Sequence, residues 1–175
     1  PGDPEIPAGG TVAIDQSRTL NAIAFKAGMA DSNRALEVYT LTVATPTISP
    51  SGSTFYAPLV ATVACSVSGA TIHFTTTGLD PTPADPVIAS GGTVSIDASQ
   101  TLKAKAWKDG WDESAIVSRA FTMTVATPTL SPGGGSYGPG QGVTVANTTP
   151  AVDLHYTTNG QEPTPADPGV ASGGT

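Results

Sequence analysis

A stretch of sixteen residues returns almost unchanged further along the chain, and this repeat limits the fold more than any other feature. "GLDPTPADPVIASGGT" begins at Gly78 and "GQEPTPADPGVASGGT" begins at Gly160. One glycine of the motif recurs at Gly9, Gly91 and Gly173 with a constant spacing, since 91 − 9 and 173 − 91 both equal 82. We call this spacing the repeat period. Since "TVATPT" recurs with the same period, no insertion or deletion separates the copies.

An ungapped match of this length indicates a tandem duplication. Residues 1–43 share about 21 identities with the residues one repeat period later, and residues 44–93 share about 25. This period suits an independent small domain with its own core better than a helical solenoid unit. We therefore predict three segments: the C-terminal part of a repeat (leading segment, residues 1–43), a complete repeat (middle segment, 44–125) and the N-terminal part of a further repeat (trailing segment, 126–175).

Two interpretations of the incomplete segments follow from this division. In the first, the chain is an excerpt from a longer array of repeats. In the second, the leading and trailing segments find partners on other molecules, because either one alone would expose apolar strand edges. The tail of one molecule would then complete the head of the next, in a head-to-tail arrangement.

The composition is typical of a secreted or surface-exposed β-protein. The chain holds 20 glycines and 16 prolines, with only 12% charged residues and a net charge of −7. This acidity argues against nucleic acids and anionic membrane surfaces as partners. Because no apolar run approaches the roughly 20 residues that span a bilayer, we predict no membrane insertion in this segment. The composition predicts an extracellular or cell-surface location.

The cysteine content indicates that apolar packing, and not a disulfide, stabilises the fold. Cys65 is the single cysteine, so no intrachain disulfide can form. Its counterpart one repeat period later is Asn147. A position that accepts both residue types suits the end of a strand, and we predict that Cys65 is a small filler rather than a reactive thiol.

The middle segment divides into seven short alternating runs separated by turn residues, which predicts a two-sheet antiparallel sandwich. We expect strands at 45–49, 59–67, 71–78, 87–89, 93–97, 101–107 and 120–125. Alternation assigns one set of side chains to the core: Val63, Ile72, Phe74, Val94, Ile96, Leu102, Ala104, Ala106, Phe121, Met123 and Val125. In the leading segment Val12 and Ile14 are expected to point inward in the same way.

Two runs of the middle segment carry a resemblance to a known family. "ATIHFTTTGLDPTP" and "GGTVSIDASQTLKAKAWKDGWDES" resemble the chitobiase/β-hexosaminidase C-terminal-type domain, with its Tyr-Thr-Thr-Asp-Gly run, Ser/Thr-Pro-Thr and "TLKA" strand before Lys-Asp-Gly and Trp. The sequence departs from that pattern at Thr77 and Asn159, where the family often has Asp, and by the extra "ADP" of the loop. The resemblance implies an all-β fold of tandem immunoglobulin-like or fibronectin III-like sandwiches. It implies a non-catalytic accessory module, found beside glycoside hydrolases and in tandem arrays of exported bacterial proteins.

Acidic and histidine side chains are the candidate metal ligands. Asp80, Asp85 and Asp97 could surround a calcium ion, but "DPTPADP" lacks the alternating spacing of a calcium loop, and a rigid solvated loop is favoured. His73 and His155 occur once per copy without an obvious second ligand, so each is predicted to be an outward-facing strand residue rather than a zinc ligand. No motif implies a cofactor.

Three aromatic residues are the candidates for a contact surface: Trp107, Trp111 and Phe25. They could bind glycans or contact a neighbouring repeat, and packing is favoured because Met29 occupies the position of Trp111 in the leading copy. Gly28 and Gly110 are predicted to take a positive φ in a tight turn before the last strand.

The sequence contains no nucleophile elbow, phosphate-binding glycine loop or convergent carboxylate pair, so we predict that it is not an enzyme. The predicted function is a structural repeat of a large secreted or cell-surface protein, such as a stalk, an adhesin or a filament subunit. Its partners would be neighbouring repeats and further copies of itself. The alternative is a carbohydrate-binding accessory module of a glycoside hydrolase, with glycans as partners.

Overall fold

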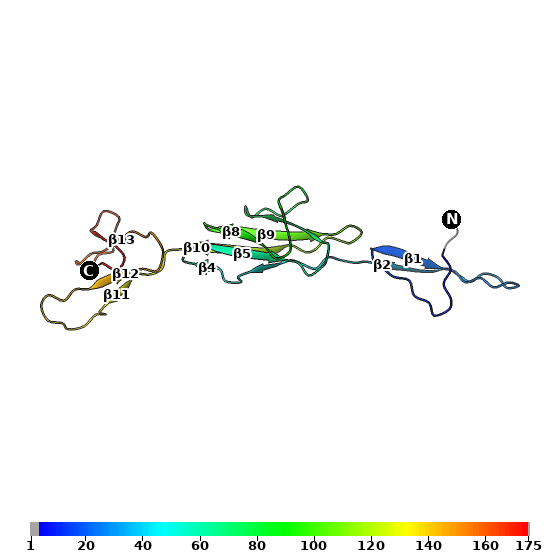
Figure 1. Cartoon of the computed structure of the whole chain (residues 1–175), viewed down its shortest axis with the longest axis horizontal. Helices are drawn as coiled ribbons and strands as arrows, with labels where there is room; N and C mark the ends of the chain where they lie inside the picture. The colour runs from blue at the N-terminus through cyan, green and yellow to red at the C-terminus, as the bar shows by residue number, and fades with distance from the viewer. Residues whose placement is uncertain (1–3, 175) are drawn as a thin grey trace. The chain divides into compact units, whose positions relative to one another are not determined.

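The structure is a computed structural model that describes residues 4–174, and its regular secondary structure there is entirely β (Figure 1). Contacts divide the chain into two compact units. The first holds the residues up to Pro50 together with Thr62–Val94 and Thr101–Arg119. The second holds Ser51–Ala61, Ser95–Gln100 and the residues from Ala120 onward. In the described part of the chain, no helix is long and apolar enough to span a bilayer.

The leading segment forms one antiparallel hairpin from β1 (Arg18–Ala22) and β2 (Ala35–Tyr39). A serine fixes the chain just beyond this hairpin, because the Ser17 hydroxyl accepts from the Leu41 N–H at 2.9 Å and donates to the Leu41 carbonyl at 3.2 Å. The expectation that Val12 is buried was wrong, since its side chain is 42% exposed. The described part of this segment pairs only two strands, which leaves little sheet surface for such a side chain to pack on.

The middle segment holds two sheets. The five-stranded sheet has the order β4-β10-β9-β6-β7 and the three-stranded sheet has the order β3-β5-β8. Their strands are β3 (Thr47–Ser49), β4 (Thr54–Phe55), β5 (Leu59–Ala64), β6 (Thr71–Thr75), β7 (Val87–Ile88), β8 (Gly92–Ile96), β9 (Gln100–Trp107) and β10 (Val117–Met123). Both sheets bury alternate residues, as the two sheets of a β-sandwich do.

Most of the predicted core is confirmed. The following predicted core residues are all at most 9% exposed: Val63, Ile72, Val94, Ile96, Leu102, Ala104, Ala106 and Phe121. Phe74 and Met123 are only half-buried. Val125 is 56% exposed, because it lies beyond the end of β10. The alternation succeeds best in β9, where Leu102, Ala104 and Ala106 are all fully buried and the residues between them are half-buried.

One strand pairing differs from the expected antiparallel pattern. β4 pairs with β10 in parallel, with Thr54 opposite Thr122 and Phe55 opposite Met123. Backbone bonds continue this pairing, from the Thr122 N–H to the Ser53 carbonyl and from the Thr124 N–H to the Phe55 carbonyl. The sequence did not predict β4, because a strand of two residues is too short to show alternation.

The trailing segment contains two separate antiparallel pairs. β11 (Thr129–Ser131) pairs with β12 (Thr144–Ala146), and β13 (Leu154–His155) pairs with β14 (Gly169–Val170). Each of these strands lies one repeat period after a strand of the middle segment, namely β3, β5, β6 and β7.

The exchange of Cys65 for Asn147 has a structural explanation. The Cys65 Sγ lies 3.4 Å from the Ala44 carbonyl, and the Asn147 side-chain amide donates to the Ala126 carbonyl at 2.5 Å. Both side chains therefore place a donor on the carbonyl that lies 21 residues earlier. Because the Asn147 amide is used in this way and the residue is half-buried, its side chain is a structural part of the fold.

Candidate functional site

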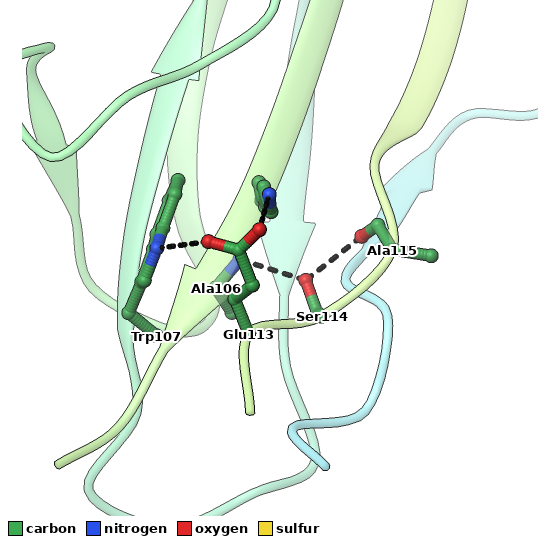
Figure 2. Close-up of polar contacts among 6 residues, drawn as sticks. Ala106, Trp107, Glu113, Ser114 and Ala115 are labelled. Atoms are coloured by element: carbon green, nitrogen blue, oxygen red, sulfur yellow. Dashed lines mark hydrogen bonds and ion pairs between the residues drawn. The ribbon is translucent and has the colours of Figure 1, made fainter. Parts of the chain in front are cut away.

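Trp107, at the end of β9, lies within a cluster of polar and aromatic contacts. Its indole N–H donates to Glu113 Oε2 at 2.8 Å, and the other oxygen of Glu113 accepts from the Lys105 ammonium (Figure 2). The ammonium also lies 5.2 Å from the Trp107 ring centroid, and the His73 ring meets the indole edge-on at 5.2 Å. The hydrogen bonds from Lys105 and then from Trp107 lower the pKa of Glu113, so the carboxylate stays ionised at neutral pH.

Ser114, the residue after Glu113, binds the segment that follows this cluster to β9. Its hydroxyl accepts from the Ala106 N–H and donates to the Ala115 carbonyl, each at 2.8 Å (Figure 2). The Ser114 N–H donates to the Ala106 carbonyl at 2.9 Å, and the residue is 3% exposed. Ser32 makes the matching bonds in the leading segment, but there it is exposed.

We expect Ser114→Ala to lower the free energy of unfolding by about 1–3 kcal/mol, because it leaves the buried Ala106 N–H without its acceptor. Ser32→Ala is the matched control, and it should change stability much less because water can replace the lost oxygen at an exposed site. Urea unfolding followed by tryptophan fluorescence measures both variants. Equal losses would show that burial of the Ala106 N–H does not set the cost.

The turn of residues 108–111 contacts the leading segment. The Trp111 N–H closes the turn on the Lys108 carbonyl at 3.0 Å, with Gly110 at φ +75°. The Trp111 indole N–H donates to the Asp15 carbonyl at 2.9 Å, and the Ser17 N–H donates to the Gly110 carbonyl at 2.6 Å. Lys108 covers the indole, with its ammonium 4.6 Å from the ring centroid.

Asp112 joins the same turn to the connection that leads into β3. Its N–H donates to the Leu41 carbonyl at 2.7 Å, and its carbonyl accepts from the Val43 N–H at 2.9 Å. These bonds form a short parallel bridge between Thr42 and Asp112, and Val43 is 2% exposed. We call the contacts of residues 15–17 and 41–43 with residues 110–112 the junction contact.

The three candidate aromatic residues have different environments. Trp107 and Trp111 are half-buried and hydrogen-bonded to different partners, whereas Phe25 is 73% exposed. Within residues 4–174, no ring contact joins any two of them. Hollows of about 520 and 290 Å³ lie in the trailing part of the chain, and none of the three aromatic residues lines either one.

The sequence pointed to the turn glycines Gly28 and Gly110, but it did not identify the residues of the junction contact. Gly28 has φ +78°, and its turn is closed by the bond from the Met29 N–H to the Lys26 carbonyl at 3.0 Å. Asp15, Ser17 and Asp112 were not identified from the sequence. One signal was present, because Ser17 recurs as Ser99, which makes the same pair of bonds to Met123 that Ser17 makes to Leu41.

The acidic loop residues already have protein partners. Asp80 pairs with the Lys103 ammonium at 2.7 Å, and Asp85 accepts from the Thr82 hydroxyl at 2.7 Å and the Thr82 N–H at 2.8 Å. The Thr82 hydrogen bonds lower the pKa of Asp85, and those of Thr164 do the same for Asp167. Among the residues that the structure describes, no three His, Cys, Asp or Glu side chains gather to hold a metal ion.

The sequence predicted an outward-facing strand residue at His73, but the residue is buried there and only 8% exposed. The proline-rich loop supplies its partner: His73 Nδ1 lies 2.7 Å from the Asp85 carbonyl oxygen. Since a carbonyl oxygen only accepts, Nδ1 carries the proton. His155 and the Asp167 carbonyl repeat this bond at 2.7 Å, so each histidine binds the backbone of the proline-rich loop in its own segment.

The comparisons with known proteins identify the middle part of the chain. Residues 49–118 match the family model described as the chitobiase/beta-hexosaminidase C-terminal domain. Searches of curated proteins and of solved structures found no significant match. The matched residues include the strands from β4 to β9, the His73 loop and the turn with Trp111. The resemblance to this family that the sequence indicated is therefore confirmed by the family-model match at residues 49–118.

Proposed function

We propose that the chain is a non-catalytic structural segment of a large secreted or cell-surface protein, in which sandwich repeats of constant length follow one another. Such a protein would serve as a stalk, an adhesin or a filament subunit. The acidic composition and the glycine- and proline-rich turns support an exposed β-protein. Support for equivalent repeats comes from bonds that recur after one repeat period, such as those of His73 and His155 with the carbonyls of Asp85 and Asp167.

The junction contact is the observation that carries this proposal. The turn of the middle segment binds backbone groups on both sides of the leading hairpin, at residues 15–17 and at residues 41–43. A connection held in this way restricts how one repeat turns against the next, which would make an array of such repeats stiff. Trp111 is then a residue that positions one repeat on another, through its indole bond to the Asp15 carbonyl.

Two tryptophan variants test the proposal. Trp111→Phe keeps an aromatic ring but removes the hydrogen bond to Asp15, worth about 0.5–1.5 kcal/mol. We expect amide hydrogen exchange at Ser17 to become about 3- to 10-fold faster, because the Ser17 N–H donates to the Gly110 carbonyl of the same turn. Trp107→Phe is the matched control, since its indole bond goes to Glu113 and should leave Ser17 unaffected.

An unchanged exchange rate at Ser17 in Trp111→Phe would contradict the proposal. Pull-down on insoluble chitin and cellulose tests the alternative function, carbohydrate binding. Binding by the unaltered chain that is lost in Trp107→Ala and kept in Trp111→Phe would favour the carbohydrate-binding module instead.

A further inference from the structure

The junction contact is built on the main chain of the leading segment. Its hydrogen bonds join the turn to the Asp15 carbonyl, the Ser17 N–H, the Leu41 carbonyl and the Val43 N–H, over distances from 2.6 to 2.9 Å. Among the groups that make these bonds, only the Trp111 indole belongs to a side chain. A contact of this kind depends on the path of the backbone more than on the side chains that flank it.

Side chains of the leading segment around this contact have other partners or face solvent. The Asp15 carboxylate accepts from the Arg18 guanidinium and is 75% exposed. Thr42 is exposed as well. The Gln16 side chain lies close to Gly110, where a Cβ atom would be 2.7 Å from its Cγ. Gln16 therefore favours glycine in the turn, and the hydrogen bonds of the contact leave its amide unused.

Ser17 holds the two stretches of the leading segment together. Its hydroxyl accepts from the Leu41 N–H at 2.9 Å and donates to the Leu41 carbonyl at 3.2 Å, an arrangement that we call the serine bridge. The same carbonyl accepts from the Asp112 N–H at 2.7 Å, as the two lone pairs of a carbonyl oxygen allow. Ser17 also donates its own N–H to the Gly110 carbonyl. One residue thus fixes groups on both stretches that the turn binds.

The serine bridge recurs one repeat period later among different neighbours. The Ser99 hydroxyl accepts from the Met123 N–H at 2.8 Å and donates to the Met123 carbonyl at 3.3 Å. Ala98 stands there in place of Gln16, and Met123 in place of Leu41. The bridge and its backbone geometry are thus retained while the side chains beside them change.

We propose that Ser17 is the positioning residue of the junction contact, and that residues 110–112 recognise the end of a serine-bridged hairpin through its main chain. The partner that this turn fits is then a repeat whose hairpin carries such a serine, whatever side chains flank it. This inference rests on the proposed function, because it requires that repeats follow one another and meet at this contact.

Amide hydrogen exchange at Asp112, measured in the full chain, tests the role of Ser17. Ser17→Ala should make exchange of the Asp112 N–H about 3- to 10-fold faster, because the Leu41 carbonyl that accepts from it loses the support of the hydroxyl. Ser17→Thr keeps a hydroxyl and should restore the rate. Ser32→Ala is the matched control, since the Ser32 hydroxyl accepts from the Ala24 N–H of the same segment, outside the junction contact.

Asp15→Ala tests recognition through the main chain. It removes the carboxylate but keeps the carbonyl that the Trp111 indole binds, so exchange at Asp112 should be unchanged. The proposal is overturned if Ser17→Ala leaves that rate unaltered, if Ser17→Thr fails to restore it, or if Ser32→Ala or Asp15→Ala accelerates it equally. Trp111→Phe gives a separate readout at Ser17. Faster exchange there, combined with no effect of Ser17→Ala at Asp112, would reject this inference and leave the proposed function standing.

Discussion

Phe121→Ala is expected to lower the free energy of unfolding of the middle segment by about 3–5 kcal/mol. Phe121 is 2% exposed, and its ring centroid lies 5.7 Å from that of Phe55. Truncation removes buried apolar surface and leaves a cavity that the surrounding β-strands can close only in part. Small domains are stable by roughly 5–15 kcal/mol in total, so the loss is a large fraction of what holds this fold together.

Tyr39→Ala is the matched control, since Tyr39 occupies the equivalent position in β2 and is 39% exposed. Its removal should cost much less than the loss of Phe121. Urea unfolding followed by the fluorescence of Trp107 and Trp111 reports on the middle segment directly. If Phe121→Ala shifted the unfolding midpoint no more than Tyr39→Ala, the core assignment would be wrong.

Gly110→Val should cost about 2–3 kcal/mol, the second largest effect that we expect. Gly110 has φ +75°, a conformation that costs a residue with a side chain about 1–2 kcal/mol and a β-branched one more. A Cβ there would also lie 2.7 Å from Cγ of Gln16, so the Gln16 side chain must move. The variant should therefore strain the turn and disturb the junction contact together.

Two further variants separate these causes. Gly110→Asn tolerates the left-handed conformation better, so it should retain more stability while still displacing Gln16. Gly28→Val carries the same backbone penalty at φ +78°, but nothing lies within 4 Å of its Cβ position. Only the Gly110 variants should therefore accelerate hydrogen exchange at Ser17. Faster exchange in Gly28→Val would mean that the turn contact is not responsible.

The sequence predicted the features that follow from local alternation. In "TLKAKAW" every second side chain faces the core, and because one face of the strand is fully buried, a one-residue error would have exposed all of them. The same rule placed His73 on the outward face of β6. It did not predict that a loop would bury His73 on that face. Alternation says on which face a residue lies, whereas burial of His73 depends on the loop that supplies the Asp85 carbonyl.

The parts of the candidate site that the sequence did not predict depend on contacts between distant residues. The Trp111 indole meets the Asp15 carbonyl across 96 positions of the chain, and no periodicity of a single strand encodes such a contact. The recurrence of Ser17 as Ser99 and of Thr42 as Thr124 indicated that these positions matter, but it could not name their partners. Trp107 differs, because the alternation in "TLKAKAW" by itself leaves Trp107 on the face opposite Leu102, Ala104 and Ala106.

The short edge strands of the five-stranded sheet limit wrong strand pairing between domains of similar sequence. That sheet ends in β4 on one side and in β7 on the other, and each is a strand of two residues. A foreign strand that reached either margin would find only a few free backbone groups to pair with. Where many domains of similar sequence are crowded together, such short edge strands would keep a completed domain from pairing with the sheet of the wrong neighbour.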